Sequence, residues 1–164
     1  MTTHQVCPTT AQTGVLEFVE NTTSLSSYLV DKDGSGAHER YYPNDWTNSQ
    51  CSKYFYPKTG VKTTDQEKKA ILLEIYKNFQ PVFRFFILES FRDCSSWMDS
   101  RLRYTHSVAV TSIVGHILGI GDRHLQNVLL DKVTAEVVHI DFGYVYEQSK
   151  LLKTPETVPF RLTR

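Results

Sequence analysis

The spacing of apolar and polar residues divides the chain into a short extended part and a longer helical part. Residues 4–8 and 14–20 are short apolar runs, and the second follows a glycine and contains Val-Leu-x-Phe-Val, so it predicts a strand. Thr23 or Ser24 then stands where an N-cap would open a short helix over residues 25–29. The chain therefore opens with strand-like segments and then enters helices.

The middle of the chain alternates polar breaks with helical patterns. Residues 31–48 predict a loop, and residues 51–64 predict a loop or frayed helix. Thr64 and Glu67 have the spacing of a capping box, and Pro81 kinks or restarts the helix that follows. We interpret the apolar stripe on both sides of Pro81 as core; it comprises Ile71, Leu72, Ile75, Tyr76, Phe79, Val82, Phe83, Phe86, Ile87 and Phe91.

A second long helix precedes the most polar loop of the chain. Residues 93–100 predict a break with Trp97 buried, and residues 101–118 predict a helix. Gly119 and Gly121 end it, because glycine adopts the left-handed turn that leaves a helix. The expected core positions of this helix are Val108, Ile113, Val114, Ile117 and Leu118.

A tight hairpin follows the polar loop. Residues 128–130 predict one strand, 131–135 the turn and 136–140 the return strand. Such a hairpin returns Asn127 and Asp141 to the same end. Asp122 stands just before it, on the loop that leaves the helix.

Composition narrows the classes of protein that fit. The chain has 164 residues, 40% of them hydrophobic, and a formal net charge of zero, which predicts one folded domain and gives no support for nucleic-acid binding through global charge. Its three cysteines, Cys7, Cys51 and Cys94, are far apart, which argues against a disulfide framework or a zinc site and indicates a reducing compartment. The N-terminus lacks signal-peptide features, and residues 108–120 are too short to span a bilayer.

The three polar side chains around the hairpin suit phosphoryl transfer. Asn127 and Asp141 offer oxygen ligands for a hard cation, Mg²⁺ or Mn²⁺, and Asp122 would orient the attacking hydroxyl. The Asp-x-x-x-x-Asn spacing equals that of the protein-kinase catalytic loop. His124 either hydrogen-bonds the transferring phosphate or braces the loop. Arg123 is expected to brace the loop through an ion pair, and His139 to be structural.

Other phosphate-binding signals are missing from the sequence. It contains neither G-x-G-x-x-G nor G-x-x-x-x-G-K-[ST], and no early strand that would supply a phosphate-binding lysine. For a kinase, this pattern predicts a chain that begins after most of the N-terminal lobe and stops before the helices that follow the activation segment. We expect such a piece to be inactive by itself.

The motifs resemble the ATM branch of the phosphatidylinositol 3-kinase-related kinase family. The reversed Asp-Arg-His of 121–127 and the Asp-Phe-Gly of 138–143 indicate the superfamily, and residues 154–163 together with the hinge-side blocks indicate the branch. Further similar blocks are residues 14–18, 36–38, 42–45 and 78–84. The resemblance implies an α+β, mostly helical fold, the C-terminal lobe of a PI3/PI4-kinase-type domain with a hinge and a catalytic-site hairpin.

The resemblance also divides the chain into functional segments. Residues 1–20 would be the end of the N-lobe and the hinge, 21–118 the C-lobe helices, 119–127 the catalytic loop, and 141–164 a truncated activation segment. It implies that Asp122 and His124 are catalytic, and that Asn127 and Asp141 bind metal. The adenine-contacting residues would be Leu16, Phe18 and Val19.

The activity implied is an ATP-dependent serine/threonine kinase of the DNA-damage response in the nucleus. It would phosphorylate proteins at Ser or Thr followed by Gln, in double-strand-break signalling and telomere maintenance, and would meet a damage-sensor complex through parts not in this segment. No membrane contact and no direct nucleic-acid site are expected. Two departures from the family pattern are Phe18 for the usual Trp and Phe142 for a frequent Leu.

Two alternatives stay open at this point. A lipid kinase of the same superfamily shares the Asp-Arg-His and Asp-Phe-Gly chemistry but needs a basic activation segment for an inositol headgroup. The basic residues of 144–164 are not clustered, which favours a protein substrate. The other alternative is a non-catalytic piece that serves as a binding module.

Overall fold

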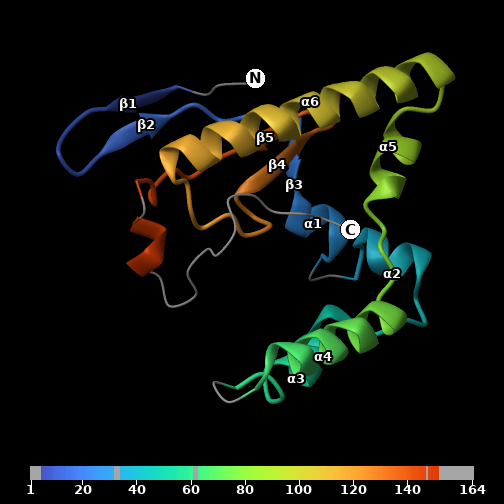
Figure 1. Ribbon diagram of the computed structural model, residues 1–164. Coiled ribbons are helices and arrows are strands. Elements are labelled where there is room, and N and C mark those ends of the chain that lie inside the picture. Colours follow the sequence, from blue (N-terminus) through green and yellow to red (C-terminus); the bar gives the residue numbers. More distant parts are fainter. Residues whose placement is uncertain (1–4, 32–33, 61–62, 147, 152–164) are drawn as a thin grey trace. The chain divides into compact units, whose positions relative to one another are not determined.

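The computed structural model describes residues 5–31, 34–60, 63–146 and 148–151 (Figure 1). Its internal contacts divide the chain into two compact units. Described residues up to Ser26 and from Phe86 onward form the first unit, and those from Ser27 to Phe85 form the second. The catalytic-type motifs all lie in the first unit.

The first unit contains two antiparallel sheets. Strands β1 (Val6–Pro8) and β2 (Gly14–Leu16) form a two-stranded ribbon, as the apolar runs predicted. Strands β3 (Thr22–Ser24), β4 (Val128–Asp131) and β5 (Val137–His139) form a three-stranded sheet in the order β3-β4-β5. The residues just after β2 therefore lead directly into the sheet that carries the hairpin.

The β4–β5 hairpin is confirmed, with a well-defined turn. Asp131 Oδ1 accepts hydrogen bonds from the N–H groups of Val133 (2.7 Å) and Thr134 (2.9 Å). Ala135 takes a left-handed φ of 65°, which lets the chain reverse. Leu130 pairs with Val137 and is fully buried, so apolar burial fixes the register.

Helix α6 (Cys94–Leu118) has 25 residues and begins earlier than the sequence predicted. The expected break at residues 93–100 is wrong, because Asp93 is the N-cap and its Oδ1 accepts from the N–H of Ser96 at 2.9 Å. Trp97 is only partly buried. The predicted end is confirmed, since Gly119 closes the helix in the left-handed conformation with φ 59°.

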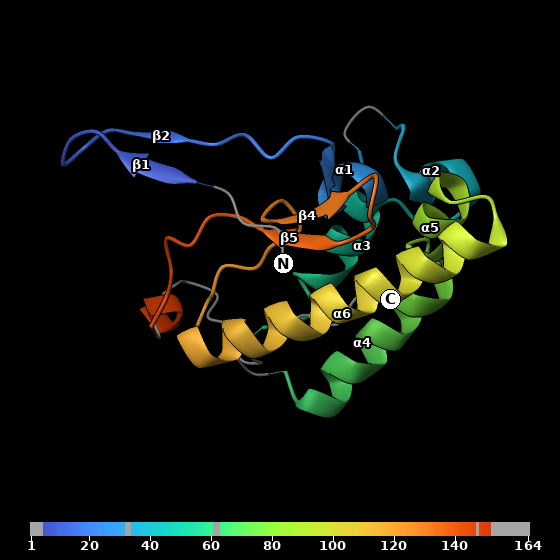
Figure 2. The same cartoon turned by 90° about the horizontal axis from the view of Figure 1, so that it is seen from above.

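The face of α6 that packs inward is also different from the expectation. Ser107, Thr111 and Gly115 are buried, whereas Ile113 and Ile117 are 61% and 73% exposed. Ser107 lies against β5, where its hydroxyl accepts a hydrogen bond from the N–H of Val137 at 2.9 Å. Helix α6 thus runs beside β5 and is bonded to it at Ser107 (Figure 2).

The remaining helices are short except for one. They are α1 (Leu25–Leu29), α2 (Ala37–Tyr41), α3 (Asn48–Phe55), α4 (Asp65–Asn78), α5 (Arg84–Ser90) and the 3₁₀ turn η1 (Gln148–Leu151). Helix α2 lies inside the segment predicted as a loop. Its His38 is buried and stacks on Phe79 with ring centroids 3.7 Å apart, so tertiary packing rather than local pattern forms it.

Capping boxes set the starts of α3 and α4. The Thr64–Glu67 box is present as predicted, with both reciprocal hydrogen bonds. The equivalent Thr47–Gln50 box opens α3, where we had expected a loop or frayed helix from residue 51. No residue of α4 is buried, so its apolar stripe is not core in this structure, whereas Val82 (3% exposed) and Phe86 (2%) are.

No helix in the described part of the chain has the length and apolar character needed to cross a membrane.

Candidate phosphotransfer site

The hairpin register brings Asn127 and Asp141 to the same end of the three-stranded sheet. Val128 on β4 pairs with His139 on β5, and one step further the N–H of Ile140 donates to the carbonyl of Asn127 at 3.1 Å. Asn127, just before β4, therefore lies beside the point where the chain leaves β5 toward Asp141. This was the spatial relation that the sequence predicted.

Asn127 is held from both its backbone and its side chain. It is 6% exposed, and its Nδ2 donates to the carbonyl of Asp122 at 3.0 Å. Its backbone N–H donates to the carbonyl of His124 at 3.0 Å. With the amide nitrogen bound to the loop, the amide oxygen Oδ1 is the atom of this group suited to a cation.

Arg123 ties the loop before the hairpin to the segment after it. The side chain is 8% exposed; its Nε donates to the carbonyl of Gly121 at 2.8 Å, and one terminal nitrogen donates to Ile140 at 2.7 Å. The other terminal nitrogen donates to the carbonyl of Asp141. The residue braces the loop as expected, and these three bonds go to backbone carbonyls.

Two carboxylates of the site lie on left-handed backbone. Asp122 and Asp141 both have φ 56°, a region that Asp tolerates better than most residues but that remains uncommon outside glycine. The N–H of Gly143 donates to Asp141 Oδ1 at 3.2 Å and so orients that carboxylate. Positive φ at two functional candidates fits the tendency of strained backbone to gather at active sites.

His124 is oriented by its own loop. Its Nδ1 accepts from the N–H of Gln126 at 3.2 Å, so the neutral ring carries its proton on Nε2. That nitrogen lies 3.9 Å from Oδ2 of Asp122. The loop therefore fixes a ring whose donor nitrogen faces the neighbourhood of the Asp122 carboxylate.

His139 is largely buried next to Arg123. Burial on β5, together with the positive charge of Arg123, lowers the pKa of His139 to about 4 from the ordinary 6.5. The ring is neutral at physiological pH. This agrees with the structural role expected for it, since a neutral imidazole next to Arg123 avoids a second positive charge.

Further backbone bonds frame the site, and the sequence did not indicate them. The N–H of Gly121 donates to the carbonyl of Tyr144 at 2.8 Å, and the N–H of Tyr146 donates to Leu118 at 2.8 Å. The segment after Asp-Phe-Gly thus returns along the end of α6. Bonds between backbone groups carry no side-chain signature, which is why residue patterns do not reveal them.

The proposed adenine contacts are not assembled with the hairpin residues here. Leu16 and Phe18 are 68% and 85% exposed, and Val19 is partly buried. Among the described residues, no hydrogen bond joins 14–19 to 127–141. Their role in binding adenine stays a prediction.

The described residues contain no group of three or more His, Cys, Asp or Glu side chains that would hold a metal ion. Mg²⁺ is commonly bound by one or two protein oxygens, with water and substrate phosphates completing its shell, so the pair Asn127 and Asp141 suits it. The block at residues 154–163 and most of the expected activation segment lie outside the described residues.

Comparisons with known proteins point to the same family as the sequence motifs. The sequence profile described as "Phosphatidylinositol 3- and 4-kinase" matches residues 1–164. The chain is 49% identical over 162 residues to "Serine/threonine-protein kinase ATM" of Drosophila melanogaster, covering 99% of this chain and 6% of that protein. It is 50% identical to "Serine-protein kinase ATM" of Sus scrofa, with 99% and 5% coverage.

Solved structures are similar over nearly the whole chain. "FAT and kinase domain of CtTel1" superposes with a TM-score of 0.85 at 44% identity, covering 98% of this chain and 11% of that one. "Tel1 kinase butterfly symmetric dimer" gives 0.82 at 38% identity, with 100% and 7% coverage. The mixed, mostly helical fold predicted for this chain is therefore that of a PI3/PI4-kinase-type domain, and the chain spans only a small fraction of its relatives' length.

Proposed function

Because this chain belongs to the phosphatidylinositol 3- and 4-kinase family, we propose that it carries the catalytic loop of an ATM-like serine/threonine protein kinase. The chemistry is transfer of the terminal phosphate of ATP to the hydroxyl of Ser or Thr followed by Gln. The observation that carries the proposal is the antiparallel register that places Asn127 beside the exit to Asp141. The relatives' names favour a protein substrate over a lipid.

Two of the residues present suit a divalent ion. Asn127 and Asp141 would hold Mg²⁺ or Mn²⁺ through oxygen atoms, and the ion would neutralise charge on the phosphates. Asp122 would accept or orient the hydroxyl proton of the substrate. His124, whose Nε2 bears the proton, would donate toward the transferring phosphate.

Arg123 acts by holding the segments that carry Asp122 and Asp141. Its three bonds to Gly121, Ile140 and Asp141 hold the loop that bears Asp122 at a fixed distance from the segment that bears Asp141. Fixing the positions of a base and a metal ligand relative to each other lowers the entropic part of the activation barrier. Arg123 is thus a positioning residue and not a catalytic one.

We extend the proposal to the functional segments, cellular setting and partners implied by the resemblance. Residues 1–20 would contribute the hinge, with Leu16, Phe18 and Val19 at adenine, and residues 141–164 part of the activation segment. The protein would act in the nucleus, in double-strand-break signalling and telomere maintenance, where a damage-sensor complex would engage it. Fractionation of cells before and after induced breaks checks this setting, and exclusion from the nucleus under both conditions would contradict it.

Phosphotransfer by the full-length protein tests the activity. Radiolabelled ATP and Mg²⁺ are offered with a Ser-Gln peptide, a matched Ser-Ala peptide and phosphatidylinositol vesicles. We expect labelling of the Ser-Gln peptide, and a loss of about 100- to 10,000-fold in the Asp122→Asn variant. Turnover of lipid alone would support the lipid-kinase alternative instead.

A further inference from the structure

A tight turn over residues 19–22 joins the proposed adenine segment to the three-stranded sheet, and we call it the connecting turn. Asn21 has a left-handed φ of 55° in this turn, a conformation that Asn tolerates better than most residues. The Thr22 hydroxyl donates to the carbonyl of Val19 at 2.9 Å, which closes the turn by a local side-chain bond. Asn21 and Thr22 together therefore set the direction in which the chain joins Val19 to the sheet.

The connecting turn is bonded to the end of the β4–β5 hairpin where the chain reverses. The N–H of Lys132 donates to the carbonyl of Asn21 at 2.8 Å. Thr22, the first residue of β3, pairs with Asp131, the last residue of β4. The connecting turn therefore has a fixed place at this end of the hairpin, and all of these residues belong to the first unit.

The chain just beyond β3 is bonded to the loop that carries the proposed catalytic residues. The N–H of Ser26 donates to the carbonyl of Leu125 at 3.1 Å. Between the two attachments lies β4, whose four residues span about 13 Å at about 3.3 Å per residue. The base and the terminal phosphate of an extended nucleoside triphosphate are a comparable distance apart. The connecting turn and the pair Asn127 and Asp141 are thus spaced suitably for the two ends of ATP.

The segment before the connecting turn is exposed and is bonded to the β1–β2 ribbon. Leu16 and Phe18 are exposed. The N–H of Glu17 donates to the carbonyl of Gln5 at 2.9 Å, and the Glu17 carboxylate accepts from the N–H of Gln5 at 2.8 Å. These bonds do not reach the three-stranded sheet, so the orientation of the segment relative to β4 depends on the connecting turn.

We propose that Thr22 is a positioning residue for the adenine end of the nucleotide, because its hydroxyl holds Val19 in place before the base binds. This inference rests on the proposed kinase function, since Val19 is an adenine contact only within it. A segment that is already fixed loses less conformational entropy on binding, so affinity for the base depends on the Thr22 bond. Binding of the phosphates at the other end of β4 does not depend on it.

Binding of the two halves of ATP to the full-length protein tests this role. Adenosine probes the adenine end, and tripolyphosphate with Mg²⁺ probes the metal end, each by isothermal titration calorimetry. Thr22→Val keeps the side-chain shape and removes the hydroxyl. We expect this variant to bind adenosine about three- to tenfold more weakly, the effect of one lost hydrogen bond. Its affinity for tripolyphosphate should stay within about twofold of that of the natural protein, because the two sites are distant.

Steady-state kinetics with a Ser-Gln peptide separates binding from chemistry. In Thr22→Val, the KM for ATP should rise by about three- to tenfold with little change in kcat, because the bond supports the bound nucleotide equally in the ground and transition states. Thr22→Ser keeps the hydroxyl and should restore both the adenosine affinity and the KM. Asn21→Gly loosens the same turn, since glycine allows more backbone conformations, and should give the same pattern if Thr22→Val does not fold.

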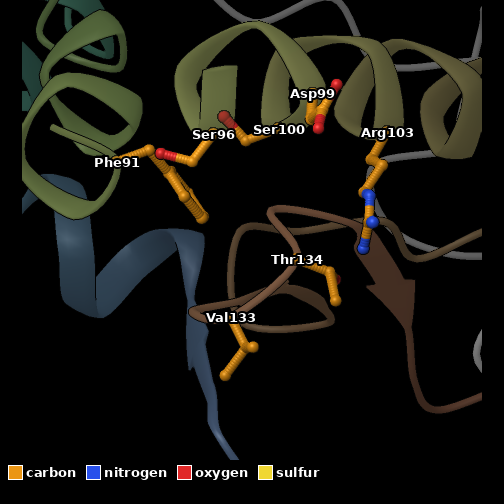
Figure 3. A pocket seen from close by; sticks show the side chains of 7 residues that line it. All are labelled: Phe91, Ser96, Asp99, Ser100, Arg103, Val133 and Thr134. Atoms are coloured by element: carbon orange, nitrogen blue, oxygen red, sulfur yellow. The ribbon is translucent and has the colours of Figure 1, made fainter. Parts of the chain in front are cut away.

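Two other threonines are matched controls for the loss of a hydroxyl. Thr23, the next residue of β3, pairs with Leu130, and its hydroxyl has no hydrogen bond among the described residues. Thr134 lies in the hairpin turn and lines a cavity of about 140 Å³ together with Ser96 and Ser100 of α6 (Figure 3). Thr23→Val and Thr134→Val should leave adenosine binding unchanged, because neither hydroxyl is bonded to the connecting turn in the described part of the chain.

Three results would overturn the role of Thr22. They are unchanged adenosine binding by a folded Thr22→Val protein, equal losses of affinity for adenosine and tripolyphosphate, and an equal effect of Thr23→Val. A natural protein that does not bind adenosine would overturn this role too. The proposed function fails on a different result, the absence of peptide labelling by the natural protein, so the two failures are distinguishable.

Discussion

At the scale of single residues, Asp122 and Asp141 each supply a carboxylate and also take a left-handed backbone conformation. Each has φ 56°, where a side chain without a local hydrogen-bonding group is disfavoured. Asn shares Asp's tolerance for this region, whereas Ala does not. Substitutions at these positions therefore separate loss of the carboxylate from loss of the fold.

Asp141→Asn should keep the fold and lose phosphotransfer. The amide accepts the left-handed conformation, but it lacks the negative charge that a divalent ion requires. We expect a melting temperature near that of the natural protein, with labelling of a Ser-Gln peptide reduced by at least about 100-fold. Equal activity would remove Asp141 from the proposed metal site, and Asp131→Asn in the hairpin turn is the matched control.

Arg123→Lys should cost both stability and activity. A lysine cannot reproduce the bonds to Gly121, Ile140 and Asp141, so one buried and two partly buried carbonyls lose their donor. We expect a decrease of about 2–4 kcal/mol in the free energy of unfolding, measured by urea denaturation. Arg103→Lys, an exposed counterpart on α6, should change the free energy of unfolding by less than about 0.5 kcal/mol. Similar losses at both positions would contradict the bracing role of Arg123.

His139 should make the first unit less stable as the pH falls below about 6.5. Its pKa is about 4 in the folded chain, against 6.5 for the ordinary group, so between these values the unfolded state binds the extra proton. The free energy of unfolding then rises with pH across this window and is unaffected by His139 above it. The His139→Gln variant should show a flatter dependence between pH 5 and 7.

Trp97 reports on the first unit when Trp46 of the second is replaced by Phe. Urea unfolding followed by Trp97 fluorescence at pH 5, 6 and 7 therefore measures this effect. The matched control is His116→Gln on exposed α6 surface. A pH dependence that is unchanged by His139→Gln would contradict the assignment.

The sequence predicted the parts of the site that depend on residue spacing, and it did not predict the parts that depend on long-range backbone bonds. The hairpin register followed from two apolar runs and a short turn, so Asn127 and Asp141 were placed correctly together. The binding pattern of Arg123 was not predictable, because its acceptors are backbone carbonyls of residues that are distant in sequence. The hinge residues Leu16, Phe18 and Val19 stay a prediction.

At the scale of elements, local capping signals were reliable and burial was not. Thr64 and Gly119 mark helix ends as predicted, since caps depend on a few neighbouring residues. The burial of α6 was misassigned because residue size suggested Ile113 and Ile117 as core. The contact with β5 instead buries the face that carries Ser107, whose hydroxyl bonds the strand.

A pair of lysine substitutions checks which face of α6 is inward. Ile113→Lys places a charge on a side that is 61% exposed and should change the free energy of unfolding by less than about 0.5 kcal/mol. Thr111→Lys buries a charge without a partner and should cost more than about 3 kcal/mol. Urea denaturation followed by Trp97 measures both, and the reverse order would mean that the isoleucine face is the packed one.

At the scale of the whole chain, the α+β, mostly helical class was predicted correctly, and the division into two compact units was not. Family blocks such as residues 36–38 and 42–45 fall in the second unit, whereas all the predicted catalytic and metal residues fall in the first. Composition and motif spacing do not report which segments contact each other. That division depends on long-range packing such as the stacking of His38 on Phe79.

The hydroxyl of Ser107 has a consequence for how the protein avoids misassembly. Strand β5 is an outer strand of its sheet, and such strands offer unpaired backbone donors to neighbouring chains. The Ser107 hydroxyl accepts the hydrogen bond of the Val137 N–H, so a strand of another chain cannot pair with β5 at that position. A Ser107→Ala lesion would therefore first be noticed as insoluble, cross-β material in the cell, before any defect in chemistry was measured.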